Sequence, residues 1–116
     1  MLNVDLNTRR DFIRFQRDEL TSSLVYAKLA SIEKDEQNKK VLNAISFEEL
    51  EHCEVLMKYT GIIPSPYGWK VILYYVLARL FGLTFTIKLM ENGESEAQDM
   101  YACYKDYPEV VALGQE

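Results

Sequence analysis

The only histidine of the chain, His52, stands three residues after a carboxylate in the stretch Glu49-Leu50-Glu51-His52. In a helix, Glu49 and His52 project from the same face, one turn apart. Such a pair can offer one metal ion a carboxylate oxygen and an imidazole nitrogen, and it is the building block of carboxylate-bridged di-iron sites in helix bundles. The same four residues are also compatible with a solvated helix face, so their neighbours decide between the two interpretations.

The neighbours favour the metal site. Glu49 and His52 lie in the middle of an otherwise apolar helix stripe made of Val41, Ile45, Leu56 and Tyr59. Glu51 instead shares its face with charged residues, namely Glu48, Glu54 and Lys58. An unpaired carboxylate in apolar surroundings is unfavourable, so an inward Glu49 needs a partner. That partner is either a metal cation or a buried Arg or Lys.

Two other apolar stripes each carry one acid at their centre. Glu19 lies among Phe12, Phe15, Ser22, Tyr26 and Leu29, and Glu94 lies among Leu80, Leu83, Ile87, Met90, Ala97, Tyr101 and Tyr104. Three inward carboxylates and one imidazole on separate helices amount to most of an octahedral ligand set for iron or manganese. The alternative is three core helices that each tolerate one acid.

Composition predicts one all-α domain over residues 1–116. The chain is 48% hydrophobic with 5 Gly and 3 Pro, which favours long uninterrupted helices. The first helix should run from a cap at Asn7 or Thr8 to about Lys34, and the second from Asp35 to Gly61. The third should run from Ser65-Pro66 to about Asp106, with a bend at Gly82 or Asn92-Gly93. Residues from Pro108 to Glu116 should start a fourth helix.

Charge and cysteine content narrow the class of protein. The net charge of −5 argues against a nucleic-acid partner and suits a protein that attracts cations. Cys53 and Cys103 are far apart and form no C-x-x-C pair, so a zinc knuckle and a rubredoxin-type iron site are excluded. We expect reduced thiols in a cytoplasmic protein, since residues 1–10 lack the apolar core of a signal peptide.

The run from Val71 to Met90 is almost entirely apolar and, at about 20 residues, could span a bilayer. Arg79 near its middle costs about 2.5–3.5 kcal/mol in a membrane, and Lys88 adds to this, so a buried or subunit-facing helix is favoured. A helix that is apolar on most sides must be covered on most sides. We therefore predict a homodimer or higher homo-oligomer, with contact to the cytoplasmic membrane face as the alternative.

The arrangement of these motifs resembles a known family. Asp18-Glu19 followed by Tyr26, then Glu49-Leu50-Glu51-His52, then Asn92-Gly93-Glu94 followed by Tyr101, is similar to the first three helices of the rubrerythrin branch of the ferritin-like superfamily. The resemblance covers about residues 10–106. Residues 69–94 look more specifically like the rubrerythrin-like domains fused ahead of vacuolar-iron-transporter-type membrane domains.

The resemblance implies a ferritin-like bundle of three long helices plus the start of a fourth, completed by dimerisation or domain swapping. It implies a di-iron centre, with manganese or zinc as alternatives. Glu19 and His52 would ligate one iron, Glu49 would bridge, and Glu94 would add the ligand from the third helix. Tyr26 and Tyr101 would orient the carboxylates through their hydroxyls.

Two departures from the family pattern shape the expected activity. The second Glu-x-x-His of the family is absent, so a continuation of the chain or a second copy would have to complete the site. Ala97 stands where rubrerythrins carry a further Glu, which, with the lack of rubredoxin-type cysteines, argues against peroxide reduction.

These observations predict an iron-binding domain that oxidises Fe(II) with O₂ or peroxide, a ferroxidase-type oxidoreductase, or senses Fe(II) for storage or transport. The competing hypothesis is a non-catalytic helical interaction module attached to a membrane protein. In that case the acids would pair with Arg79, Arg14 or Lys88.

Overall fold

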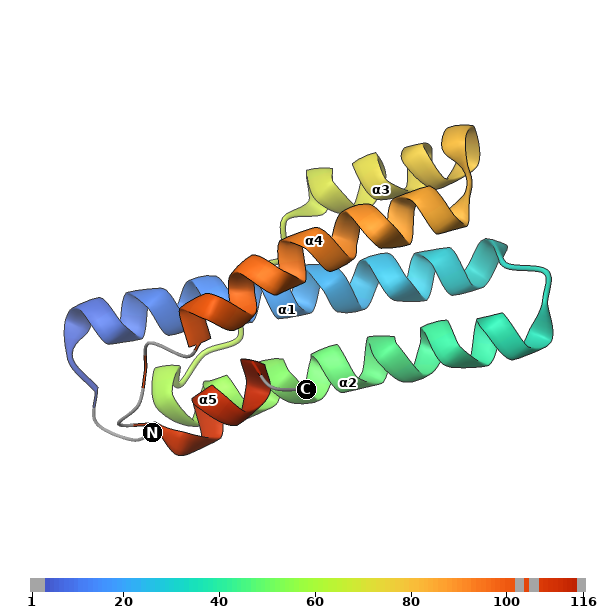
Figure 1. The fold of residues 1–116 in the computed structure, drawn as a ribbon. Coiled ribbons are helices and arrows are strands. Elements are labelled where there is room, and N and C mark those ends of the chain that lie inside the picture. The colour runs from blue at the N-terminus through green and yellow to red at the C-terminus, as the bar shows by residue number, and fades with distance from the viewer. Residues whose placement is uncertain (1–3, 102–103, 105–106, 115–116) are drawn as a thin grey trace.

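The computed structural model describes residues 4–101, 104 and 107–114, and it gives side chains for these residues except 93–101 and 114. The described part is all-α and contains no strand: α1 (Leu6–Ile32), α2 (Glu36–Thr60), α3 (Gly68–Phe81), α4 (Leu83–Tyr101) and α5 (Pro108–Gly114). The helices α1 and α2 form a long antiparallel hairpin (Figure 1). The helices α3 and α4 form a second hairpin on the α1 side, and α5 lies beside the end of α2.

The ends of the first hairpin follow local capping chemistry. The carboxylate of Asp35 accepts a hydrogen bond from the Asn38 backbone N–H at 2.9 Å, and Gly61 ends α2 in the left-handed region at φ 75°. Both ends of α2 therefore lie where the sequence predicts. The predicted cap of α1 at Asn7 or Thr8 is wrong, because Asp5 accepts the Thr8 backbone N–H at 2.8 Å and opens the helix two residues earlier.

The predicted third long helix is corrected by the structure, which divides it at Gly82. This glycine has φ 94° and ψ 163°, a backbone conformation that is essentially restricted to glycine, and the chain reverses there (Figure 1). The first half also begins later than predicted, after Tyr67 rather than at Ser65-Pro66. The apolar run from Val71 to Met90 is thus a hairpin. Among the described residues, no helix has both the length and the apolar content that crossing a membrane requires.

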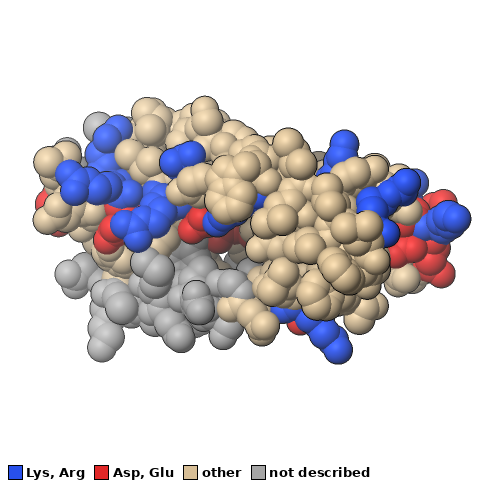
Figure 2. Space-filling model, turned by 90° about the horizontal axis from the view of Figure 1, so that it is seen from above, with Lys and Arg blue, Asp and Glu red and all other residues tan. Residues whose placement is uncertain are grey.

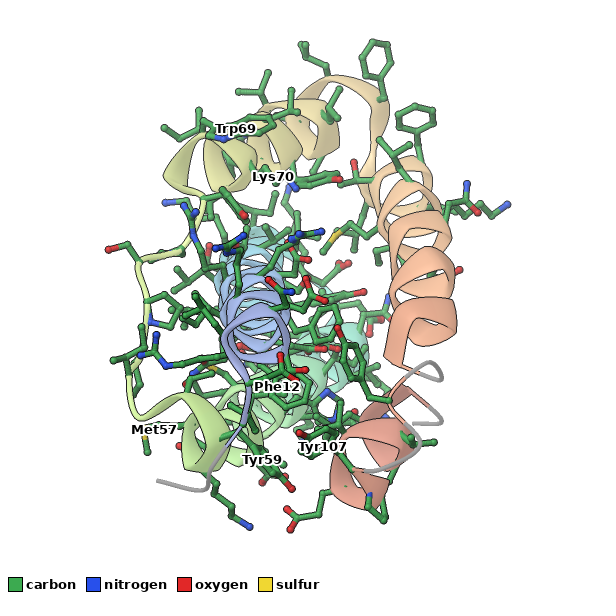
Figure 3. The ribbon with its side chains drawn as sticks, turned by 90° about the vertical axis from the view of Figure 1, so that its left-hand side faces the viewer. Phe12, Met57, Tyr59, Trp69, Lys70 and Tyr107 are labelled. Atoms are coloured by element: carbon green, nitrogen blue, oxygen red, sulfur yellow. The ribbon has the colours of Figure 1, made fainter. Side chains whose placement is uncertain are left out.

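The core consists of two separate apolar clusters. One lies where α1, α2 and α5 meet and contains Phe12, Phe15, Leu56, Tyr59, Val110 and Leu113. Figure 3 shows the Phe12, Tyr59 and Tyr107 rings gathered there, and each pair makes an edge-to-face contact at 5.2–5.5 Å. The other joins α1 and α2 to the α3–α4 hairpin and contains Val25, Tyr26, Leu29, Ala30, Leu42, Ala78 and Met90. The middle of the α1–α2 hairpin lies between these clusters.

Candidate metal centre

Three of the predicted ligands come together in this middle section. Glu19 on α1 and Glu49 and His52 on α2 each offer a ligand atom, and these atoms all lie within 4.8 Å of one another. The Nδ1 atom of His52 is 3.2 Å from Oε2 of Glu19, within hydrogen-bonding distance. The two helices thus bring together residues that are 33 positions apart in the chain.

The cluster is largely shielded from water. Glu19 is 8% exposed and His52 is 7% exposed, whereas Glu49 is half-buried. Glu51, one position before His52, is exposed, as its charged face predicts. Burying ionisable groups is unfavourable unless they are paired or bind a cation. Three such groups gathered in one shielded place are therefore a candidate functional site.

The relative positions of α1 and α2 are set by hydrogen bonds on both sides of the cluster. On one side, Ser23 and Ser46 donate their hydroxyls to each other's backbone carbonyls, both at 2.8 Å. On the other side, the Thr60 hydroxyl donates to Oε1 of Gln16 at 2.6 Å, and Nε2 of Gln16 donates to the Ile62 carbonyl at 2.7 Å. Sequence analysis did not single out these polar residues. Their signal is weak, because Ser, Thr and Gln also occur at solvated helix positions.

The donor atoms fit a first-row metal ion. Metal–nitrogen and metal–oxygen bonds of about 2.0–2.2 Å place adjacent ligands about 3 Å apart and opposite ligands about 4.2 Å apart. The 3.2 Å between His52 Nδ1 and Glu19 Oε2 matches adjacent ligands. Two carboxylates and one imidazole form a mixed O/N donor set that suits iron, manganese or zinc. These three residues can therefore hold one such ion with small side-chain adjustments.

The other predicted site residues are Tyr26 on α1 and Glu94 and Tyr101 on α4. Tyr26 is buried in the apolar cluster next to α3 and α4, two turns after Glu19 on α1. The side chains of Glu94, Ala97 and Tyr101 belong to the part of α4 that lies outside the described side chains. The structure therefore brings together Glu19, Glu49 and His52 and does not address the predicted ligand from the third helical stretch.

Two cations that could have served as structural partners make other contacts. Arg14 is paired with Asp11 at 3.5 Å on the protein surface, and the Arg79 guanidinium lies 5.9 Å from the centre of the Tyr75 ring. Glu19 contacts His52 within the cluster, with 3.2 Å between its Oε2 atom and His52 Nδ1. In these contacts, neither arginine is paired with Glu19.

Cys53 follows His52 and is also buried. Burial raises the pKa of its thiol, a hydrogen bond with Gln16 lowers it, and the nearby negative charge of Glu19 raises it further. The group of clustered ligand atoms in the described residues consists of Glu19, Glu49 and His52 and does not include the Cys53 sulfur. The donor set of that group is therefore oxygen and nitrogen.

Comparison of the chain with protein-family models, with curated proteins and with solved structures gives no match. The functional argument therefore rests on the chemistry of the three clustered residues.

Proposed function

We propose that this protein is a ferritin-like iron-binding domain whose centre includes Glu19, Glu49 and His52, and that it takes up Fe(II) for oxidation or sensing in iron storage or transport. The observation that carries the proposal is the clustering of Glu19, Glu49 and the only histidine, His52, whose ligand atoms lie within 4.8 Å of one another between two apolar clusters. Glu19 and His52 are buried and Glu49 is half-buried. The antiparallel α1–α2 hairpin, with ligands facing inward from both helices, supports the ferritin-like assignment.

The three residues have distinct parts in binding. The carboxylates of Glu19 and Glu49 supply negative charge to a divalent cation, and His52 supplies a neutral nitrogen. His52 Nδ1 and Glu19 Oε2 contact each other, and both atoms would need a free lone pair to bind a metal. Protons compete with the metal for these ligand atoms, so Fe(II) affinity should fall as the pH is lowered.

A di-iron centre needs more ligands than these three residues provide. Glu94 is one proposed source, and a second copy contributing its own Glu19, Glu49 and His52 is another. Two irons held by these ligands would supply one electron each, enough to reduce O₂ to hydrogen peroxide with two protons from the solvent. Without those further ligands, the same three residues support reversible binding of one Fe(II).

Anaerobic Fe(II) titration of metal-free protein tests the proposal. We expect Glu49→Ala and His52→Ala to abolish most of the bound iron, because each removes an inward ligand, whereas Glu51→Ala should bind as the parent does. Bound Fe(II) should also raise the melting temperature of the parent and of Glu51→Ala only, since a ligand that binds the folded state stabilises it. Equal binding by all four proteins, or no uptake by the parent, would refute the proposal.

The second candidate function is a non-catalytic helical interaction module. The observation that favours it is the set of large apolar side chains that α3 and α4 expose. Metal analysis of the purified protein separates the two functions, because an interaction module has no requirement for bound iron.

A further inference from the structure

Five aromatic rings contact one another where α1, α2 and α5 meet, in the apolar cluster beside the candidate metal centre. Their ring pairs have centres 5.1–6.4 Å apart. We call these residues the aromatic group: Phe12, Phe15, Tyr59, Tyr104 and Tyr107. Phe15 lies four positions before Glu19 on α1, so the two residues are neighbours on one helix face. The aromatic group therefore reaches to within one helical turn of a predicted metal ligand.

Tyr104 connects this group to an acid near the protein surface. Its hydroxyl donates a hydrogen bond to the Asp11 carboxylate, and its ring centre lies 5.8 Å from that of Phe15. Tyr104 and Asp11 are both half-buried, and Asp11 also pairs at 3.5 Å with the exposed Arg14. Acidic and basic atoms lie side by side at the end of the molecule that carries the first turns of α1 (Figure 2). A proton held by Asp11 can therefore pass on to water.

A phenol that is hydrogen-bonded to a carboxylate can lose an electron and a proton together. The electron leaves the ring, the proton moves along the hydrogen bond to the carboxylate, and a neutral tyrosyl radical remains. Without an acceptor, oxidation would leave a cationic phenol in partly buried surroundings, which is unfavourable. The Asp11 carboxylate therefore makes Tyr104 easier to oxidise than a tyrosine that lacks such a partner.

The electron count at the candidate metal centre requires such a donor. The three clustered residues can hold one iron, and one Fe(II) supplies one electron, whereas hydrogen peroxide takes two. If the second electron is not supplied, the O–O bond breaks to give a hydroxide ion and a free hydroxyl radical. A nearby side chain that gives up an electron prevents that release.

We propose that Tyr104 supplies this second electron and that Asp11 accepts its proton, an inference that rests on the proposed Fe(II) site. Fe(II), hydrogen peroxide, the Tyr104 phenol and the Asp11 carboxylate then give Fe(III), two hydroxide ions, a tyrosyl radical and the Asp11 carboxylic acid. The O–O bond breaks, and peroxide takes one electron from iron and one from Tyr104. The electron passes by way of the Phe15 ring, which contacts Tyr104 and lies one turn from Glu19.

Electron paramagnetic resonance tests the proposal on protein that is loaded anaerobically with equimolar Fe(II), mixed with equimolar hydrogen peroxide and frozen. We expect a tyrosyl radical signal from the parent and none from Tyr104→Phe. Asp11→Asn should give a signal about ten-fold weaker, because an amide oxygen accepts the hydrogen bond but does not take up the proton. Spin-trapped hydroxyl radical should increase in both variants, since the second electron is no longer supplied.

Two control variants retain the Tyr104–Asp11 pair. Tyr75→Phe removes the hydroxyl of a half-buried tyrosine on α3, and Arg14→Gln removes the surface partner of Asp11. Both should give the radical signal of the parent. All four variants should bind Fe(II) as the parent does in anaerobic titration, because none of them alters a predicted ligand.

Three results would overturn this inference: a radical signal that persists in Tyr104→Phe, a signal from Asp11→Asn equal to that of the parent, or no radical from a parent that binds Fe(II). Loss of the signal in Tyr75→Phe would overturn it as well, since the radical would then lie on α3. Each of these results leaves Fe(II) binding intact and so bears on Tyr104 alone. A parent that takes up no Fe(II) would refute the proposed function together with this inference.

Discussion

Ser23 of α1 and Ser46 of α2 exchange hydrogen bonds, each hydroxyl donating to the other residue's backbone carbonyl at 2.8 Å. Such a reciprocal pair requires the two helix backbones to approach closely at one level. Glu19 lies one turn before Ser23, and Glu49 lies almost one turn after Ser46. The Ser23–Ser46 pair therefore sets how far α1 is shifted along α2, and at this shift Glu19 contacts His52.

We predict that Ser23→Ala and Ser46→Ala each reduce the free energy of unfolding by about 0.5–1.5 kcal/mol, because each removes one partly buried hydrogen bond. The double variant should lose less than the sum, since both bonds act on the same contact. Fe(II) affinity should fall by up to about ten-fold although every ligand is retained. Urea unfolding and Fe(II) titration measure these effects. Ser31→Ala is the control, because that exposed hydroxyl bonds only within α1, to Lys28.

We predict that Gly82→Ala destabilises the protein by about 1–3 kcal/mol, because φ 94° with ψ 163° is strained for any residue with a Cβ atom. A Cβ at this position would meet no atom within 4 Å, so the loss would come from the backbone alone. Gly68→Ala is a matched control with equally open surroundings and no positive φ. Thermal unfolding of both variants measures the difference, and equal stability of the two would contradict the account.

Asp18 should make stability depend on pH. Burial raises its pKa above 3.8, while the nearby Lys70 lowers it and Glu19 raises it. A carboxyl whose pKa is higher in the folded state than in the unfolded state binds its proton more tightly when the protein is folded. This stabilises the folded state in full below pH 3.8, and the stabilisation is lost as the pH rises through the folded-state pKa. Ionised Asp18 therefore destabilises the folded protein at neutral pH.

Replacing this carboxylate removes the penalty. We predict that Asp18→Asn is more stable than the parent at pH 7, by up to about 1 kcal/mol, and that the gain disappears as the pH falls towards 3.8. Urea unfolding of metal-free protein between pH 4 and pH 7 measures it. Glu51→Gln, at an exposed position, controls for the loss of one negative charge. A constant difference across this pH range would show that another property of the substitution is responsible.

Much of this molecule follows from local sequence pattern. The apolar stripes predict the all-α class and the inward positions of Glu19 and His52, because side-chain direction in a helix repeats every 3.6 residues. Asp35 and Gly61 mark the ends of α2 because capping depends on residues within one turn. The start of α1 was mispredicted because Asp5, Asn7 and Thr8 are all competent caps, and local chemistry does not rank them reliably.

Other features depend on contacts between distant segments. The sequence predicted a bend at Gly82 or at Asn92-Gly93. In the structure the chain reverses fully at Gly82, and α3 packs beside α4. The 3.2 Å contact between Glu19 and His52 depends on how far α1 slides along α2, which helical periodicity leaves free. The sequence by itself determined which side chains face inward. The tertiary structure decided which of them meet, because only inter-helix hydrogen bonds and core packing fix the level at which two helices lie together.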